Sequence, residues 1–291
     1  MQRGKYFKYV LLGPSITILA VTALYPIIFA LIVSFRDWRL ARSLTPGEFV
    51  GFDNYLRAFT DERFHNSMIV TLEFVLISVP MSIILGLAMA LFLQRRTRLN
   101  TFTKTLLILP FGVAPVLKGH SWRFMMDTQY GIFDKIIDTL IPPLANIVWL
   151  QEEFWALFIL AVTEVWGWAP LIALMFLGAL GTLNPEVLDA AKVDGANDWQ
   201  AFWRVTLPLL SPLILLITLL RIISSLRMFD QVVTLTGGGP GDATQTLNYF
   251  VYESGFRFFD FGYSAALAYI LTAILYFVAY FYVKSLLQRS A

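Results

Sequence analysis

Charged side chains interrupt several long apolar runs of this chain, and those in two of the runs are the residues best suited to chemistry. Glu164 stands alone in one run, whereas Arg221, Arg227 and Asp230 stand in or beside a later one. A charge at the centre of a bilayer costs about 2.5–3.5 kcal/mol on insertion scales, so such residues face protein or a water-filled cavity. These four residues therefore predict ion pairing or contact with a polar solute.

The positions of these charges along their runs suggest particular pairs. At about 1.5 Å rise per residue, Glu164 and Arg221 lie at depths that differ by little more than one helical turn. We expect them to pair beside a translocation path when no solute is bound. Arg227 has three alternatives: a pair with Glu73, a pair with Asp230 on the same helix face, or a guanidinium that reaches the outer interface.

Aromatic and basic residues bear on the solute. Trp166 and Trp168 bracket a glycine, and indole rings suit the C–H faces of a sugar, although core packing explains any single tryptophan better. Lys118, His120 and Arg123 would suit an anionic solute, whereas structural ion pairs are compatible with a neutral one. The expected solute path comprises Glu164, Trp166, Trp168, Arg221, Arg227 and Asp230.

Catalytic chemistry has little support. The chain has two histidines, no cysteine and no clustered pair of acids, which leaves few groups for metal or nucleophilic catalysis. The net charge is +2 and the basic residues form no stripe, so nucleic acid is not an expected partner. We expect no catalytic residue, no metal site and no cofactor on this chain.

Composition identifies the elements that must position these residues. The chain is 57% hydrophobic and 14% charged, against about 25% charged in soluble domains. Six runs are long enough to span a bilayer as helices, and none has the alternating period of a membrane β-strand. We predict an all-α integral membrane protein with six transmembrane helices, at 9–35, 66–93, from about 105, 154–181, 209–236 and 261–283.

Six spans place both termini on one side of the membrane. Basic residues are slightly more numerous on that side, and the densest basic cluster, at 95–104, contains no acid. Since short cytoplasmic loops are rich in lysine and arginine, we expect cytoplasmic termini. The first run is too long for a signal-peptide core, so it is interpreted as a retained span.

A polar segment at 182–208 separates the fourth and fifth runs. Asn184 can cap a helix whose first residue is Pro185, with Glu186 in the first turn, and Gly195 can end this helix in a left-handed conformation. The local signals predict a short helix of about ten residues followed by a tight turn.

A second helix follows the turn. Asn197 and Gln200 have the spacing of a capping box, and Pro208 marks the start of the fifth span. Ala190 and Ala191 are small enough to allow close approach of a partner. On these grounds alone the segment could be a docking element or an ordinary cytoplasmic loop.

Asp189-Ala190-Ala191, Gly195 four residues later, and then Val205-Thr206-Leu207-Pro208 resemble the EAA loop of permease subunits in binding-protein-dependent ABC importers. Asp189 and Val205 stand where many members have glutamate and isoleucine. The resemblance implies that this loop docks into a cytoplasmic ATPase. The residues that it implies for coupling are Glu186, Asp189, Ala190, Ala191, Asp194, Gly195, Ala196, Arg204 and Pro208.

Other segments resemble the carbohydrate-uptake branch of that family, the maltose and glycerol-phosphate type. They include Gly51-Phe52-Asp53-Asn54-Tyr55 and the glycine-rich stretch Gly237–Gly241. The glycine-rich stretch lacks the Gly-Lys-Ser/Thr of a P-loop, so nucleotide binding is not expected there. The resemblance implies an outer loop near a docked solute-binding protein.

The resemblance covers nearly the whole chain. It implies a single permease domain over 1–291 with the type I ABC importer fold, in a bacterial inner membrane. Implied partners are a second related permease, a dimer of ATPase subunits that hold ATP and Mg, and a periplasmic or lipid-anchored binding protein. The solute would be a sugar, a polyol, or a phosphorylated or sulfonated sugar. The main alternative is an ion-gradient-driven secondary transporter, and a membrane-embedded enzyme is a more distant one.

Overall fold

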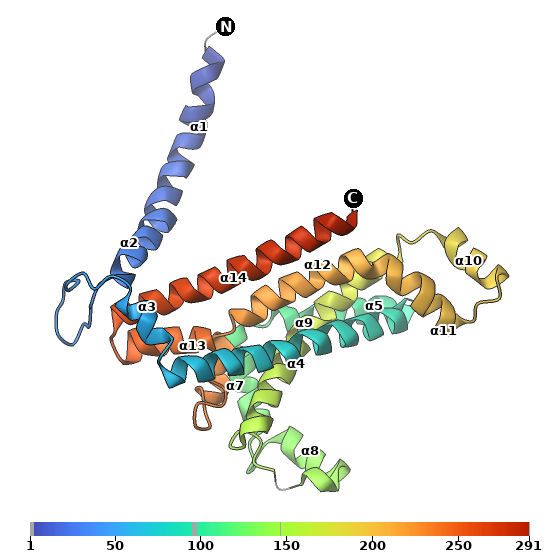
Figure 1. The fold of residues 1–291 in the computed structure, drawn as a ribbon. Coiled ribbons are helices and arrows are strands. Elements are labelled where there is room, and N and C mark those ends of the chain that lie inside the picture. Colours follow the sequence, from blue (N-terminus) through green and yellow to red (C-terminus); the bar gives the residue numbers. More distant parts are fainter. Residues whose placement is uncertain (1–2, 95–97, 146, 291) are drawn as a thin grey trace. The chain divides into compact units, whose positions relative to one another are not determined.

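The computed structural model describes residues 3–94, 98–145 and 147–290. Arg95 and Arg96 of the basic cluster at 95–104 lie outside the described residues. Within these ranges the chain is helical and has no β-strand (Figure 1). The elements are α1 Arg3–Leu19, η1 Ala20–Leu24, α2 Tyr25–Ser34, α3 Asp53–Ala58, α4 Glu62–Leu93, α5 Arg98–Leu106, α6 Leu109–Gly112, α7 Pro115–Met125, α8 Ile132–Leu140, η2 Pro142–Leu144, α9 Glu153–Leu180, α10 Pro185–Val193, α11 Asp198–Ala201, η3 Phe202–Thr206, α12 Leu207–Leu226, η4 Val232–Thr236, α13 Leu247–Tyr252, η5 Glu253–Arg257 and α14 Phe261–Ser290.

Five helical stretches of the described chain are long and apolar enough to cross a membrane, or six if one bent pair counts as a span. The bent pair is Phe102–Gly112 with Pro115–Met125, which meet at 97°. The bend follows from Pro115, because a proline disfavours the helical region for the residue before it. Ala114 accordingly has ψ 137°. The predicted third span therefore exists only as a broken one, whereas the other five runs are helices.

The predicted fifth span, 209–236, extends past the residue at which the observed helix ends. α12 stops at Leu226, and the helix that follows begins again at Asp230. Side chains distant in sequence take the carbonyls at the break. Asn248 donates to the carbonyl of Arg227 at 2.9 Å, and Thr246 donates to that of Met228 at 3.0 Å. These bonds replace helical ones, so the chain can leave the helix without unsatisfied carbonyls.

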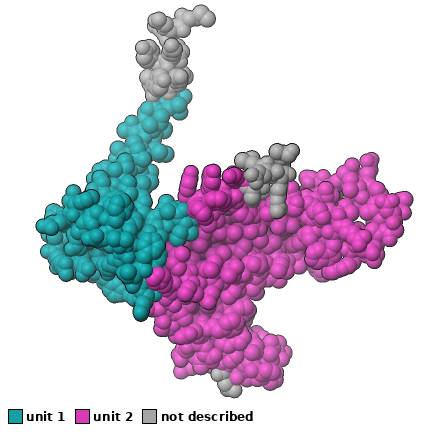
Figure 2. Space-filling model, in the orientation of Figure 1, with its two compact units in different colours: residues 1–64, 250–274 teal, residues 65–249, 275–291 magenta. Residues whose placement is uncertain are grey.

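The described chain forms two compact units, residues 1–64 with 250–274 and residues 65–249 with 275–291 (Figure 2). The first unit is held by polar contacts. Asp260 accepts a hydrogen bond from Arg57 at 2.7 Å and lies 3.4 Å from Arg39. Tyr263 donates to Asp61 at 2.8 Å. Both carboxylates therefore link residues that are about 200 positions apart.

The second unit is built around α9. In its most apolar stretch 67% of the residues are buried within the chain, the largest share among the candidate spans. Small residues such as Ala161 and Ala173 are fully buried there, as expected where membrane helices approach closely. Ile172 and Phe176 of α9 pack with Ala90 of α4 and Leu210 of α12. This three-helix core fixes the helices that carry the charged residues.

Candidate functional site

The ion pair predicted between α9 and α12 is present. Arg221 Nη1 donates to Glu164 Oε1 at 3.0 Å, and the two side chains are 1% and 5% exposed. Arg221 Nη2 also donates to Ser225 at 3.3 Å, and its guanidinium lies 4.6 Å from the centroid of the Trp168 ring. A buried ion pair therefore joins α9 to α12.

Gln231 completes the environment of the carboxylate. Its Nε2 donates to Glu164 Oε2 at 3.0 Å, so both oxygens of Glu164 are occupied. Gln231 is 2% exposed, and its own Oε1 has no hydrogen-bond partner in the described chain; the same holds for Arg221 Nε. A buried polar atom without a partner is costly, so these two atoms are the unsatisfied groups in the surroundings of the ion pair.

A polar cavity of about 280 Å³ opens beside this pair. It lies between the α6–α7 bend, α9 and the break after α12, and the name "polar cavity" is used for it below. Its charged lining residues are of both signs, and Trp168, Phe111 and Phe229 supply aromatic faces. The lining comprises Phe111, Val113, Pro115, Lys118, Glu164, Trp168, Ser224, Arg227, Met228, Phe229, Asp230 and Gln231.

Lys118 of α7 reaches the polar cavity across the surface of α9. A β-carbon placed on Gly167 would lie 2.6 Å from its ammonium nitrogen, so the absence of a side chain at 167 lets the ammonium approach the helix. Lys118 is 5% exposed, yet within the described ranges no hydrogen bond or ion pair reaches its ammonium. It is therefore a buried cation with no direct partner.

The structure separates the predicted path residues. Four of them, Glu164, Trp168, Arg227 and Asp230, line the polar cavity. Arg221 is not part of the lining and donates a hydrogen bond to Glu164. Trp166 does not belong to this lining. It is 40% exposed, and its ring lies 6.2 Å from that of Trp122.

The second predicted pair is not found. Arg227 and Asp230 do not share a helix face, because the helix breaks between them. Glu73 lines a different cavity, with Glu153. Within the described residues Arg227 forms no ion pair with either acid. Arg227 and Asp230 are both exposed. This agrees with the alternative in which the Arg227 guanidinium reaches toward water.

Gln231 was absent from the predicted path. Its signal in the sequence is weak, since it is a single amide among apolar residues. Lys118 is predicted only as support for an anionic solute and not as a path residue, and its position relative to Glu164 depends on the 97° bend before α7.

The coupling segment adopts the predicted capped helices. The Asn184 side chain accepts from the backbone of Glu186 at 3.1 Å at the start of α10. At its end Gly195 has φ +84°, and the amides of Gly195 and Ala196 donate to the carbonyls of Lys192 and Ala191, each at 3.0 Å. This is a Schellman motif, in which a left-handed glycine closes the helix.

The capping box at the start of α11 is also present. Asn197 accepts from the amide of Gln200 at 2.8 Å, and the Gln200 side chain accepts from the amide of Asn197 at 3.1 Å. α11 continues through the π turn η3 into α12, so the helix from Asp198 to Leu226 is uninterrupted.

The surface of the coupling segment is open. Asp189 and Ala190 are exposed, and the Asp189–Lys192 pair at 3.9 Å is an exposed one that contributes little to stability. Large apolar side chains are exposed as well: Val193 is 88% and Trp199 is 68% exposed. In Figure 1 α10 and α11 lie beyond the ends of α9 and α12. Exposed apolar residues among charged ones are typical of a protein-binding surface.

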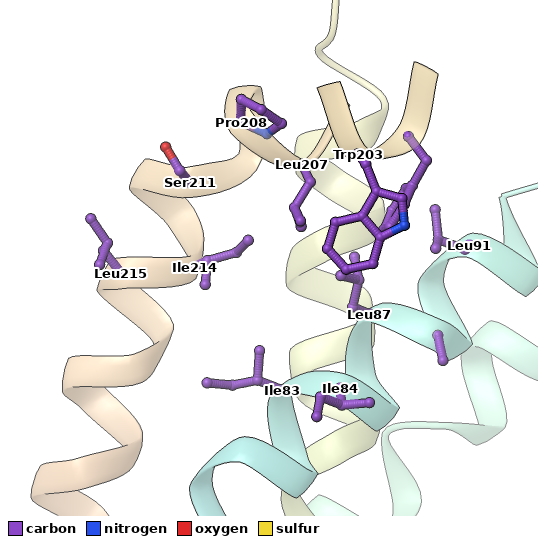
Figure 3. A pocket seen from close by; sticks show the side chains of 12 residues that line it. Ile83, Ile84, Leu87, Leu91, Trp203, Leu207, Pro208, Ser211, Ile214 and Leu215 are labelled. Atoms are coloured by element: carbon purple, nitrogen blue, oxygen red, sulfur yellow. The ribbon is translucent and has the colours of Figure 1, made fainter. Parts of the chain in front are cut away.

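A larger groove of about 630 Å³ lies between α4 and the start of α12 (Figure 3). Trp203 and Pro208 of the coupling segment border it. Among its described lining residues Ser211 alone carries a hydroxyl group, so this part of the groove offers little to a hydroxyl-rich solute. The lining comprises Ile83, Ile84, Leu87, Ala88, Leu91, Phe202, Trp203, Leu207, Pro208, Ser211, Ile214 and Leu215.

The glycine-rich stretch is held by side-chain hydrogen bonds to its backbone carbonyls. Tyr249 donates to the carbonyl of Gly237 at 2.8 Å, and Thr244 donates to that of Gly239 at 2.7 Å. Gly238 lies so close to the Tyr249 ring that a β-carbon there would be 2.7 Å from it. The loop thus packs against the ring without a P-loop geometry.

Comparisons with known proteins agree on one family. The model of the family described as "Binding-protein-dependent transport system inner membrane component" matches residues 54–291. The trehalose/maltose transport system permease protein MalF of Thermococcus litoralis is 31% identical over 92% of this chain and 88% of its own. The sulfoquinovosyl glycerol transport system permease protein SmoG of Agrobacterium fabrum is 31% identical over 91% of this chain and 85% of its own.

Solved structures share the fold. A chain of a bacterial alginate ABC transporter, crystallised with its alginate-bound periplasmic protein, superposes with a TM-score of 0.80 at 19% identity, covering 96% of this chain and 93% of its own. A chain of the MetNI methionine ABC transporter gives 0.54 at 15% identity, covering 78% of this chain and 97% of its own.

Proposed function

Because this chain belongs to the family of inner membrane components of binding-protein-dependent transport systems, we propose that it is one of two related permeases in an ATP-driven importer of a sugar or sugar-like solute. Residues 1–291 would act as one transmembrane domain with cytoplasmic termini. A periplasmic or lipid-anchored protein would deliver the solute, and ATP and Mg would be held by a pair of separate ATPase subunits.

The observation that carries this proposal is the exposed, doubly capped pair of helices α10 and α11. It combines small residues at Ala190 and Ala191 with exposed Val193 and Trp199. A rigid element of this kind can transmit a movement of an ATPase to α12, since α11 and α12 form one uninterrupted helix. Closure of the ATPases would then alternate the spans between outward-open and inward-open states.

The polar cavity is the proposed place for the solute. It offers aromatic faces at Trp168 and Phe111 and polar groups at Gln231 and Asp230, the combination typical of a pocket for a hydroxylated ligand. The relatives named for trehalose, maltose and sulfoquinovosyl glycerol support a sugar-like solute. Within this proposal the chain moves solute and catalyses no bond chemistry.

The coupling role is tested at Gly195. Valine is costly at φ +84°, whereas asparagine tolerates the left-handed region. We expect Gly195→Val to insert into the membrane but to lose a co-purifying ATPase and at least about tenfold of ATP-driven uptake, and Gly195→Asn to keep both. Equal uptake by the two variants would refute the coupling role. Uptake that follows a proton or sodium gradient without any ATPase would favour the secondary transporter instead.

A further inference from the structure

We propose that the solute of the polar cavity is a hydroxylated monoanion and that Lys118 binds its negative group. The inference rests on the proposed function, because it specifies the solute that the same site would take. It starts from a local imbalance of charge. A mostly buried cation is stabilised by a counter-charge, and Lys118, which is 5% exposed and lines the polar cavity, has none in direct contact within the described chain.

The nearby carboxylate does not pair directly with Lys118. Glu164 already accepts from Arg221 and Gln231, each at 3.0 Å. Lys118 and Glu164 attract one another, but no ion pair within 4 Å joins them in the described chain. The buried charges at the site are therefore Lys118 and Arg221 against Glu164, an excess of one positive charge.

The rim of the polar cavity does not alter this balance. Arg227 and Asp230 both line it and both are exposed. Since their charges are opposite, the excess of one positive charge remains when they are counted. A single carboxylate, sulfonate or sulfate ester would neutralise it, whereas a neutral sugar would leave Lys118 unpaired.

Other lining residues suit the rest of the solute. Asp230 and Ser224 line the polar cavity, and a carboxylate or a hydroxyl oxygen can accept a hydrogen bond from a solute hydroxyl while the anionic group pairs with Lys118. Trp168 is also part of the lining, and an indole ring can pack against the apolar face of a sugar. Together these groups suit an acidic sugar.

The test uses the fact that the natural chain has no cysteine. Ser224 lines the polar cavity, so Ser224→Cys places a single thiol there, and Leu140→Cys, which is 74% exposed before substitution, provides a reference thiol. The chain is isolated from its own membrane with whatever subunits accompany it. Each thiol is then reacted with sulfonatoethyl and trimethylammonioethyl methanethiosulfonate at low salt.

The expected result is a preference for the anionic reagent at 224 relative to 140. At roughly 8 Å in a water-filled cavity, one unit charge gives an about sixfold preference. Lys118→Met should abolish the preference and Lys118→Arg should restore it, while Lys192→Met, at an exposed lysine of α10, should leave it unchanged. No preference at 224 in the chain that retains Lys118 overturns the proposal, even if the Lys118 variants do not fold.

Protection identifies the solute class. Glucuronate or glucose 6-sulfate at millimolar concentration should slow labelling at 224, and glucose should not. Equal protection by glucose, or no protection by either acidic probe, overturns the inference. Protection by an acidic probe, together with no ATP-driven uptake of that probe, would support the acidic site and refute the importer. ATP-driven uptake of glucose that survives Lys118→Met would support the importer and refute the acidic site.

Discussion

Removing one charge of the Glu164–Arg221 pair should destabilise the second unit much more than removing both. Glu164→Gln leaves a buried guanidinium without a counter-charge, and Arg221→Met leaves a buried carboxylate with only Gln231 as a donor. The double variant leaves neither, and a glutamine at 164 can still accept from Gln231. The three variants with the parent chain form a double-mutant cycle.

The size of the effect follows from the geometry. The charged atoms are 3.0 Å apart, and the side chains are 1% and 5% exposed, so solvent hardly screens them. At an effective dielectric constant of about 20, unit charges about 4 Å apart attract by about 4 kcal/mol. Breaking a buried pair typically costs about 3–5 kcal/mol, whereas replacing both partners is often nearly neutral. We therefore expect each single variant to lose about 3–5 kcal/mol, with a coupling of at least about 2 kcal/mol.

Unfolding in SDS, followed by the fluorescence of the eight tryptophans, measures these free energies. Trp168 lies against the guanidinium, so its emission also reports the local change. Arg204→Met, at an exposed arginine, serves as a control and should change stability by less than about 0.5 kcal/mol. Single losses that add to the double loss within about 0.5 kcal/mol would show that no energetic coupling joins the two residues.

Three further predictions concern other parts of the chain. Gly167→Ala should displace the Lys118 ammonium and weaken binding of the acidic probes severalfold, with little loss of stability because the flexible end of the lysine can move. Gly178→Ala on the same helix, where a β-carbon meets nothing within 4 Å, should change neither probe binding nor stability. Thiol protection measures the binding, and thermal melting measures the stability. Asn197→Ala should lower the helicity of the coupling segment, since a lost N-cap costs about 1 kcal/mol; unchanged amide exchange at 198–201 would contradict this. Asp260→Ala should raise the exchange of first-unit amides, because it removes the acceptor that joins two arginines; an unaltered exchange pattern would argue against that role.

The caps of the coupling segment could be predicted because each depends on residues a few positions apart. Asn184, Gly195 and the Asn197–Gln200 box need only their own turn of chain. The long apolar spans are equally local, since a run of about 20 apolar residues suffices to cross a bilayer. The pairing of Glu164 with Arg221 followed from depth along two such spans.

The polar cavity could not be predicted in the same way. Its wall depends on the break after Leu226, and that break uses Thr246 and Asn248, whose proximity is a property of the fold. The approach of Lys118 to Gly167 likewise depends on the 97° bend before α7. Pro115 marks the place of that bend in the sequence, but neither its angle nor the helix that it faces.

The π turn η3 makes the helix tolerant of a shorter chain at one place. A π turn holds about one more residue than the α-helical period requires. Deleting one residue from 202–206 would therefore convert the π turn into an α-helical turn and leave the direction of α11 relative to α12 nearly unchanged. The same deletion early in α12 would rotate α11 by about 100°. A single-codon deletion at the π turn should thus preserve the side to which Trp199 points, whereas one in the neighbouring α-helical turns should not.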